Sequence, residues 1–377
     1  MTRGTAKGFR LGTHRIHEPE ETWERIRGLL PLAGISRVAD VTALDRIGIP
    51  VWQAVRPASR NLSVSQGKGA TPAAAKVSAA MEALELWHAE DLSRLPRIDI
   101  SLREMRSASP IPLESLRWAS GAPVPDAARI PWVPARAPRT GAGGWLPRAM
   151  LELDFRVPLG LSIRPFNISS NGLASGNCFE EALLHAVCEL VERHGAWLAH
   201  QEPARRTMVD PETVDEPSCR EMVERFRAAG LKLAIQNLTW EAGLPVLQVD
   251  AVAPDIANIW RGSGCHTSPA VALSRALTEA AQSRLTFISG ARDDLPAFVE
   301  GLGPYEAFIE PEEGRSFAGI ADFSTDSVAD DLARVLDRLA AMGLEVWAVD
   351  LTREEVGVSV VSAFIPGLRE LPPGAAR

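Results

Sequence analysis

Three segments of the sequence carry acidic side chains at one shared helical spacing. In each, an alanine is followed seven residues later by a glutamate, and three residues after that by a second glutamate or a glutamine. At 3.6 residues per turn, these positions lie on one face of a helix. They are Ala75, Glu82 and Glu85, then Ala182, Glu189 and Glu192, then Ala272, Glu279 and Gln282. In a single helix of this kind, the glutamates usually only face solvent. Three helices with the same register favour a common polar site.

The neighbouring residues support helices rather than strands. Thr71 and Ser268 stand at N-cap positions, and each is followed by proline, which is favoured at the first position of a helix. Apolar residues then return every three to four positions, as at Val77, Met81 and Leu84. We therefore expect three helices that present their acids to one another.

If the three helices converge, their acids form a cage of oxygen ligands. Mg²⁺ prefers oxygen ligands and commonly shares them with substrate phosphates. A di-iron bundle would instead use Glu-x-x-His on two helices, and Glu192 is followed at that spacing by Gly195. The residue types therefore favour Mg²⁺ over iron.

Glycine-bearing segments precede all three helices and could bind phosphate. Lys68 stands between two glycines just before the first helix, where backbone N–H groups and the helix dipole attract anions. Taken alone this is more often a turn, but Gly176-Asn177 and Gly262-Ser-Gly264 occupy similar places. Together they predict a nucleotide site with bound metal. Arg193 and Arg284 are either helical salt-bridge partners or clamps on phosphate oxygens.

Composition limits the classes of function. The chain has 377 residues, 46% of them hydrophobic, and a net charge of −8, which argues against nucleic-acid binding through general surface charge. No apolar run is long enough to span a membrane. The four cysteines show no Cys-x-x-Cys pair, so we expect reduced thiols and a cytoplasmic protein.

A helix followed by two β-rich runs occurs three times, at about 18–56, 217–254 and 328–366. Such repeats predict an α/β (α+β) fold in which helices stack on antiparallel strands around a central site. We expect one catalytic domain over 1–377. Within this domain, the sequence predicts an irregular insert at about 97–148, with a partial strand near 129–134.

These motifs together resemble the YcaO family, which uses ATP to activate backbone amides of peptides. The resemblance extends from about Lys7 to Pro366. It rests on the following motifs: Ser65-Gln-Gly-Lys-Gly-Ala-Thr-Pro72, Ser78-Ala-Ala-Met-Glu-Ala-Leu-Glu85, Ala174-Ser-Gly-Asn177 with Glu181-Ala182, Glu189-Leu-Val-Glu-Arg193, Ala276-Leu-Thr-Glu-Ala-Ala-Gln-Ser-Arg-Leu285 and Ser289-Gly-Ala-Arg-Asp-Asp294.

The resemblance implies roles for matching residues. Four acids would hold Mg²⁺ ions that bridge ATP phosphates: Glu82, Glu85, Glu189 and Glu192. The nucleotide site would include Lys7, Arg15, Lys68, Ser78, Asn177, Glu181 and Arg193. Arg193, Glu279, Gln282 and Arg284 are the candidate catalytic residues. His194 departs from the family, in which many members carry an acid after this arginine.

The resemblance also implies a reaction. A nucleophile attacks a peptide carbonyl, and ATP then phosphorylates the oxyanion so that oxygen can leave. The chain ends Leu371-Pro-Pro-Gly-Ala-Ala-Arg377 rather than in the Pro-x-Pro-x-Pro tail of azoline-forming members. Gly12-Thr-His-Arg15 and Asp45-Arg-Ile-Gly-Ile-Pro50 are similar to the subgroup that works with a TfuA partner. We therefore expect a thioamide product, with sulfide or a sulfur carrier as donor.

Other expectations follow from the same resemblance. The substrate would be a peptide or protein, with no separate leader-binding domain in the chain, and a homodimer is common in the family. An azoline-forming cyclodehydratase and a non-catalytic nucleotide-binding scaffold stay as alternatives. Acyl transfer by Cys265 and His266 is a third alternative, which predicts activity without ATP.

Overall fold

The predicted helix-and-hairpin repeat forms three units with the same order of elements. The computed structural model describes residues 5–119, 124–156, 165–291, 303–308 and 314–371. In each unit a helix leads into a two-stranded hairpin, a third antiparallel strand pairs with that hairpin, and this third strand leads into a long helix. The first unit consists of α1 (Pro19–Ile26), β1 (Arg37–Asp40), β2 (Val51–Val55), β3 (Val64–Lys68) and α2 (Pro72–Ala89).

The second unit repeats this order with one strand added at its edge. Strand β8 (Thr207–Val209) extends the sheet beside β9. The other elements are α6 (Pro217–Ala228), β9 (Lys232–Asn237), β10 (Val246–Val252), β11 (Ile259–Cys265) and α7 (Pro269–Ile288). The hairpins predicted at 18–56 and 217–254 are confirmed.

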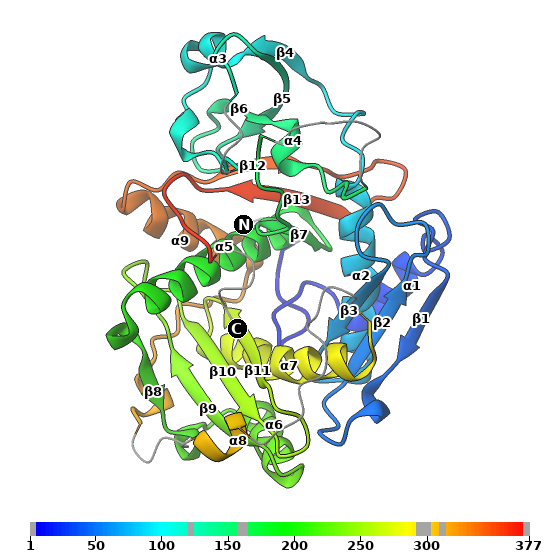
Figure 1. Ribbon diagram of the computed structural model, residues 1–377, viewed down its shortest axis with the longest axis vertical. Coiled ribbons are helices and arrows are strands. Elements are labelled where there is room, and N and C mark those ends of the chain that lie inside the picture. The colour runs from blue at the N-terminus through cyan, green and yellow to red at the C-terminus, as the bar shows by residue number, and fades with distance from the viewer. Residues whose placement is uncertain (1–4, 120–123, 157–164, 292–302, 309–313, 372–377) are drawn as a thin grey trace.

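The third unit is assembled from two distant parts of the chain. Its first helix and hairpin are α9 (Val328–Ala341), β12 (Trp347–Asp350) and β13 (Ser359–Phe364). Its third strand, β7 (Leu173–Gly176), pairs with β13 and leads into α5 (Phe179–Gln201). The C-terminal hairpin therefore completes a sheet whose remaining strand lies near the middle of the sequence. In Figure 1, the long helices α2, α5 and α7 of the three units surround the centre of the molecule.

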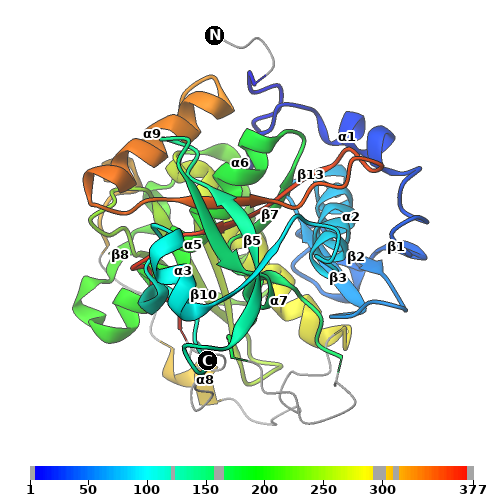
Figure 2. The same ribbon diagram turned by 90° about the horizontal axis from the view of Figure 1, so that it is seen from above.

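The stretch at 97–148 is more regular than the sequence predicted. It extends the third unit's sheet, because β5 pairs with β12, and it covers β12 and β13 in Figures 1 and 2. The partial strand predicted near 129–134 is present as part of β5 (Arg129–Arg136), although it contains Pro131 and Pro134 and proline is rarely found inside sheets. Its elements are β4 (Ile98–Ser101), α3 (Leu102–Ala108), β5 (Arg129–Arg136), β6 (Gly143–Pro147) and α4 (Arg148–Leu151).

The glycine-bearing segments before the long helices, which the sequence predicted as phosphate-binding entries to those helices, contain the strands β3, β7 and β11. Each strand packs so closely on the helix after it that a side chain would collide. A Cβ atom at Gly67 would lie 2.0 Å from the Ala79 nitrogen, and one at Gly262 would lie 2.1 Å from the Ala276 oxygen. Close backbone approach, rather than a phosphate turn, explains these glycines.

The core consists of three apolar clusters. One lies between α2 and the insert, one between α5 and α9, and one between α7 and the sheet of β9 to β11. The short remaining elements are α8 (Gly303–Ala307) and 3₁₀ turns at Thr42–Leu44, Leu113–Ser115, Pro203–Arg205, Pro211–Thr213 and Phe317–Gly319. Among the described residues, no helix is long and apolar enough to cross a membrane.

Candidate nucleotide and metal site

A cavity of about 580 Å³ lies where the three long helices meet. This volume is in the range of small-molecule sites. The three helices contribute their acid-bearing faces, and β3, β7 and the N-terminal segment supply the remaining walls. All six positions predicted from the helical spacing line the cavity: Glu82, Glu85, Glu189, Glu192, Glu279 and Gln282.

The carboxylates of α2 and α5 are crowded together. Burial raises the pKa of Glu85 well above its usual range, and the charges of Glu82 and Glu189 raise it further. Burial also raises the pKa of Glu192 to about 7, against the opposing charge of Arg193. Burial and mutual repulsion disfavour the ionised form of these carboxylates. A bound divalent cation would relieve that repulsion.

The acid of α7 has a different environment. Lys68 at the end of β3 forms an ion pair of 2.5 Å with Glu279. Burial raises the pKa of Glu279, but Lys68 and Arg193 outweigh burial and lower it below its usual value. At the next position α7 carries the neutral Gln282. The α7 face therefore adds little net negative charge to the cavity.

Arg193 stands between the two kinds of acid. Its guanidinium lies 3.4 Å from Glu189 and 3.7 Å from Glu192. Burial lowers its pKa, but the charges of Glu192, Glu189 and Glu279 raise it overall. Arg193 is thus a fixed cation beside the acid cluster, as a phosphate clamp requires.

Glu181 organises the opposite end of the cavity. Its carboxylate accepts hydrogen bonds from Arg15 (3.2 Å), the Ile16 N–H (3.0 Å) and the backbone and side chain of Asn177 (3.1 and 3.0 Å). Arg15, Asn177 and Glu181 all line the cavity, as does Ser78. Arg15, Asn177 and Glu181 are therefore joined by hydrogen bonds at one part of the cavity.

Two predicted site residues lie away from the cavity. The Lys7 ammonium is enclosed between His14 Nδ1 (2.9 Å) and Asp331 Oδ2 (2.6 Å). Arg284 is 2% exposed and pairs with Asp45 and Asp255, because the helix directs it toward the second unit's core. Neither side chain lines the cavity, so the nucleotide role predicted for Lys7 and the catalytic role predicted for Arg284 stay predictions, with no direct cavity contact to support them.

Other sequence signals also lead away from the cavity. Cys265 and His266 are buried, and burial raises the pKa of the Cys265 thiol well above its usual range, which argues against a nucleophile. His88 follows Glu85 at Glu-x-x-His spacing, but its Nδ1 bonds to the Leu84 carbonyl and it does not line the cavity. All four cysteines are free thiols. Arg292 to Asp294, at the end of the last family-like motif, lie outside the described residues.

Sequence reasoning missed some cavity residues that a stricter use of the repeat would have found. His185 and Arg275 line the cavity at the register position that Ser78 occupies on α2, three residues after the shared alanine. Thr13 and Gln66 also line it, but no periodic pattern marks them.

The cavity walls suit a charged, oxygen-rich ligand. Five lining residues each have a buried polar atom with no hydrogen-bond partner among the described residues, and four of these atoms are N–H donors or hydroxyl groups suited to phosphate oxygens. The atoms are Thr13 Oγ1, Gln66 Nε2, Arg193 Nε, Arg275 Nε and Gln282 Oε1. The hard oxygen donors of α2 and α5 suit Mg²⁺. The residues present therefore fit a nucleotide with its metal.

Comparisons with known proteins show the family of the chain. A sequence model of the YcaO family, described as a cyclodehydratase that binds ATP and Mg²⁺, matches residues 66–369. An uncharacterized protein of Mycobacterium tuberculosis H37Rv is 40% identical over 297 residues, covering 78% of this chain and 67% of that protein. An uncharacterized protein in the tfuA 3′ region of Rhizobium leguminosarum bv. trifolii is 36% identical over 393 residues, covering 97% and 92%.

Solved structures share the fold. YcaO from Methanopyrus kandleri, bound with AMPPCP and Mg²⁺, has a TM-score of 0.76 at 23% identity and covers 98% of this chain and 99% of that one. A heterocyclase in complex with substrate and cofactor has a TM-score of 0.83 at 22% identity. The match covers 98% of this chain but 54% of the heterocyclase, so this chain spans about half of that protein.

Proposed function

The chain belongs to the YcaO family of ATP- and Mg²⁺-binding, cyclodehydratase-type enzymes, and from this premise we propose that it uses ATP to activate a backbone amide of a peptide or protein. The observation that carries the proposal is the convergence of two Glu-x-x-Glu pairs beside Arg193 in one cavity. A scaffold that only binds a partner has no need for such mutually repelling acids. We further propose that residues 1–377 act as one catalytic domain.

The residues of the cavity divide into two groups in this proposal. Glu82, Glu85, Glu189 and Glu192 hold Mg²⁺, which neutralises phosphate charge when bound. The nucleotide contacts come from Arg15, Lys68, Ser78, Asn177 and Glu181. Arg193 stabilises the charge of the transferred phosphoryl group, and Glu279 with Gln282 completes the wall beside it.

The proposed reaction installs sulfur in place of the amide oxygen. Sulfide adds to the peptide carbonyl carbon and leaves an oxyanion, which attacks the γ-phosphorus of ATP and releases ADP. The phosphorylated oxygen then departs as phosphate while the carbon–sulfur double bond forms. An amide oxygen is a poor leaving group, and phosphorylation removes that barrier.

A TfuA-like partner is part of the proposal. The Rhizobium leguminosarum relative, which aligns over 97% of this chain, is named as a protein in the tfuA 3′ region. The motifs Gly12-Thr-His-Arg15 and Asp45-Arg-Ile-Gly-Ile-Pro50 are similar to those of the TfuA-associated subgroup and support the same partner. We propose that the partner delivers sulfur or the substrate, and that the enzyme acts as a homodimer.

Azoline formation is the second candidate. The family description as a cyclodehydratase favours it, and the two reactions share the oxyanion and its phosphorylation. They differ only in the nucleophile, which is a Cys, Ser or Thr side chain of the substrate in azoline formation. Mass spectrometry separates the products, because a ring loses water whereas a thioamide exchanges oxygen for sulfur and requires sulfide.

Calorimetric titration with ATP and Mg²⁺ tests the site. We expect binding to the native chain and its loss in both Glu82→Gln and Glu192→Gln, because each removes a ligand charge from a divalent ion held by few carboxylates. Arg284→Lys is the matched control, since this charged residue lies outside the cavity. Undiminished binding in both glutamate variants would contradict the proposed metal site.

A further inference from the structure

The N-terminal strap, residues 5–17, connects the third unit to the cavity. At its start, the Lys7 N–H donates to the Asp326 carbonyl (3.0 Å) and the Val328 N–H donates to the Thr5 carbonyl (2.9 Å), so the strap pairs with the chain before α9. Phe9 and Arg15 then exchange two backbone hydrogen bonds of 3.0 Å around a turn at Gly12, whose φ is +71°. The strap is therefore a short hairpin tied down at its N-terminal end.

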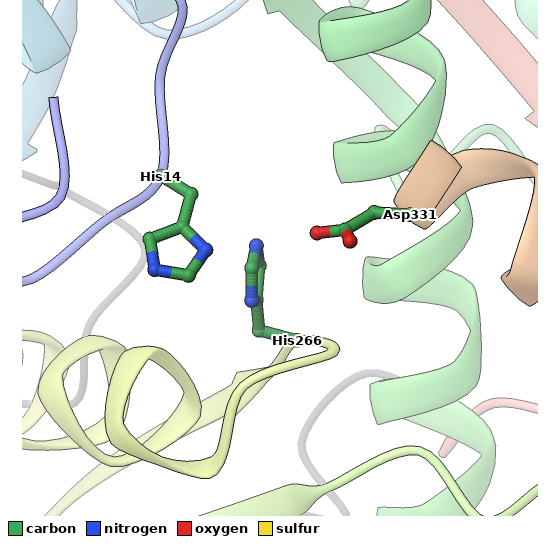
Figure 3. Close-up of side chains that lie close together, drawn as sticks. All are labelled: His14, His266 and Asp331. Atoms are coloured by element: carbon green, nitrogen blue, oxygen red, sulfur yellow. The ribbon is translucent and has the colours of Figure 1, made fainter. Parts of the chain in front are cut away.

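A buried ion pair holds this hairpin. The Lys7 ammonium donates to His14 Nδ1 on the returning arm and to Asp331 Oδ2 on α9, and the side chains of Lys7 and Asp331 are both 0% exposed. Asp331 also accepts hydrogen bonds from the hydroxyl groups of Thr267 (2.8 Å) and Thr325 (2.8 Å). Figure 3 shows His14, His266 and Asp331 directed toward one another from three different segments.

This cluster has the residue types of a metal site, but its details indicate an ammonium site. One ligand atom each from His14, His266 and Asp331 lie within 4.8 Å of one another. Lys7 Nζ already bonds to two of these side chains. His266 Nδ1 accepts the Ser268 N–H at 3.0 Å, so its proton is on Nε2, where it blocks coordination. The cluster is built around the Lys7 ammonium.

The same hairpin supplies one wall of the cavity. Phe9, Leu11, Thr13 and Arg15 line it, while His14 is directed into the buried cluster. Neighbouring residues in an extended segment face opposite sides. Fixing His14 therefore fixes Thr13 and Arg15 on the cavity side, where Arg15 meets Glu181.

We propose that Lys7 is a positioning residue, whose ammonium locks the N-terminal strap against α9 and so holds Arg15 at the nucleotide. The effect on nucleotide affinity rests on the proposed function, whereas the lock itself does not. Lys7 contributes through Asp331 and His14 rather than by touching phosphate, which explains its absence from the cavity wall.

Chemical rescue of Lys7→Ala tests the proposal. The substitution leaves a buried hole beside Asp331 that n-propylammonium can fill with the missing side-chain atoms. Two readouts are measured with and without this cation: trypsin cleavage after Arg10 and Arg15, identified by mass spectrometry, and Mg·ATP affinity by calorimetry. We expect faster cleavage and about tenfold weaker ATP binding in Lys7→Ala, and n-propylammonium should reverse both.

The controls separate a lock from a general loss of stability. Sodium at the same concentration should not rescue Lys7→Ala, and n-propylammonium should not rescue Lys7→Ala combined with Asp331→Asn, which removes the carboxylate charge. Lys232→Ala is the matched lysine deletion on β9, remote from the strap, and should match the native chain in both readouts.

Each remaining outcome is informative. Native cleavage rates in Lys7→Ala would overturn the lock, as would faster cleavage that n-propylammonium fails to slow. Rescued cleavage with unchanged ATP affinity would overturn the positioning role. If the native chain binds no ATP, the proposed function fails, but the cleavage measurements still decide whether the lock exists.

Discussion

The acids of α2 and α5 and the acid of α7 share one helical register but have opposite electrostatic environments. On α2 and α5, burial and neighbouring carboxylates raise the pKa values of Glu85 and Glu192. On α7, Lys68 and Arg193 lower the pKa of Glu279 against the effect of burial, and the second acid is replaced by Gln282. The acids of α2 and α5 therefore still lack a compensating cation, whereas Lys68 already compensates the acid of α7. The repeat determines where the acids lie, and the residues around each acid determine its ionisation.

The most sensitive test of this difference is to neutralise one acid of α2 and the acid of α7 and to compare the two variants. Glu85→Gln should weaken Mg²⁺-dependent ATP binding by roughly 100-fold, about 2.7 kcal/mol, because a ligand charge is lost. Glu279→Gln should have a much smaller effect, since its charge is already compensated by Lys68. Calorimetry on both variants measures the difference. Equal losses would mean that all three helices bind the metal alike.

A pH titration sharpens the comparison through Glu192. Its folded pKa of about 7 lies above the usual value of 4.5, so the folded, metal-free protein binds this proton more tightly than the unfolded chain. Its contribution to stability is thus fully present below about pH 4.5 and is lost as pH rises through about 7, on the order of 3 kcal/mol. Mg²⁺ should restore that stability at high pH.

Thermal unfolding from pH 5 to pH 8, with and without Mg²⁺, checks the titration. The stabilisation by Mg²⁺ should grow with pH, because the metal competes with the proton for the carboxylate. Glu192→Gln should remove most of this pH dependence. A Mg²⁺ effect that is independent of pH in the native chain would count against a titrating ligand.

Removing the Lys68 cation should make the acid of α7 resemble the acids of α2 and α5. Lys68→Met deletes the ion pair with Glu279 while keeping much of the side-chain volume. We expect about tenfold weaker ATP binding, about 1.4 kcal/mol, together with tighter Mn²⁺ binding in the absence of nucleotide, measured by electron paramagnetic resonance. Weaker Mn²⁺ binding instead would show that Lys68 does not oppose the metal.

The smallest effect on the site is expected from Arg284. Arg284→Lys should lower the free energy of unfolding by about 1 to 2 kcal/mol, because the bidentate contacts to Asp255 and the bond to Asp45 cannot all be remade by an ammonium. ATP affinity should stay within about twofold of the native value. Chemical denaturation and calorimetry on one preparation test both. A large loss of affinity with intact stability would return Arg284 to the site.

The sequence was informative where a pattern repeats. The shared spacing predicted the six acid and amide positions on α2, α5 and α7, and the alternating runs predicted the hairpins of all three units. These features are local, since helical and strand periodicity follow from neighbouring residues.

The sequence was uninformative where a contact depends on distant residues. Nothing near Lys68 indicates that it meets Glu279, and nothing near Lys7 indicates Asp331, because each pair is joined only by the folded chain. Glycines that permit close packing on a helix resemble glycines of phosphate-binding segments, so the sequence alone predicts phosphate binding where the strands β3 and β11 lie. Arg284 follows Gln282 by two residues, so the helical spacing that predicts the acid-bearing face of α7 also places Arg284 on the side away from it.

The divided third unit also determines when the site can form during synthesis. The ribosome makes α5, with Glu189 and Glu192, well before β12 and β13, which complete the sheet of β7 and cover α5. Until residue 364 has emerged, two of the four proposed metal ligands lack the sheet that holds their helix in place. Contacts of such long sequence separation form late and slowly. A nascent chain therefore completes its proposed Mg·ATP site in one late step, after residue 364 has been made.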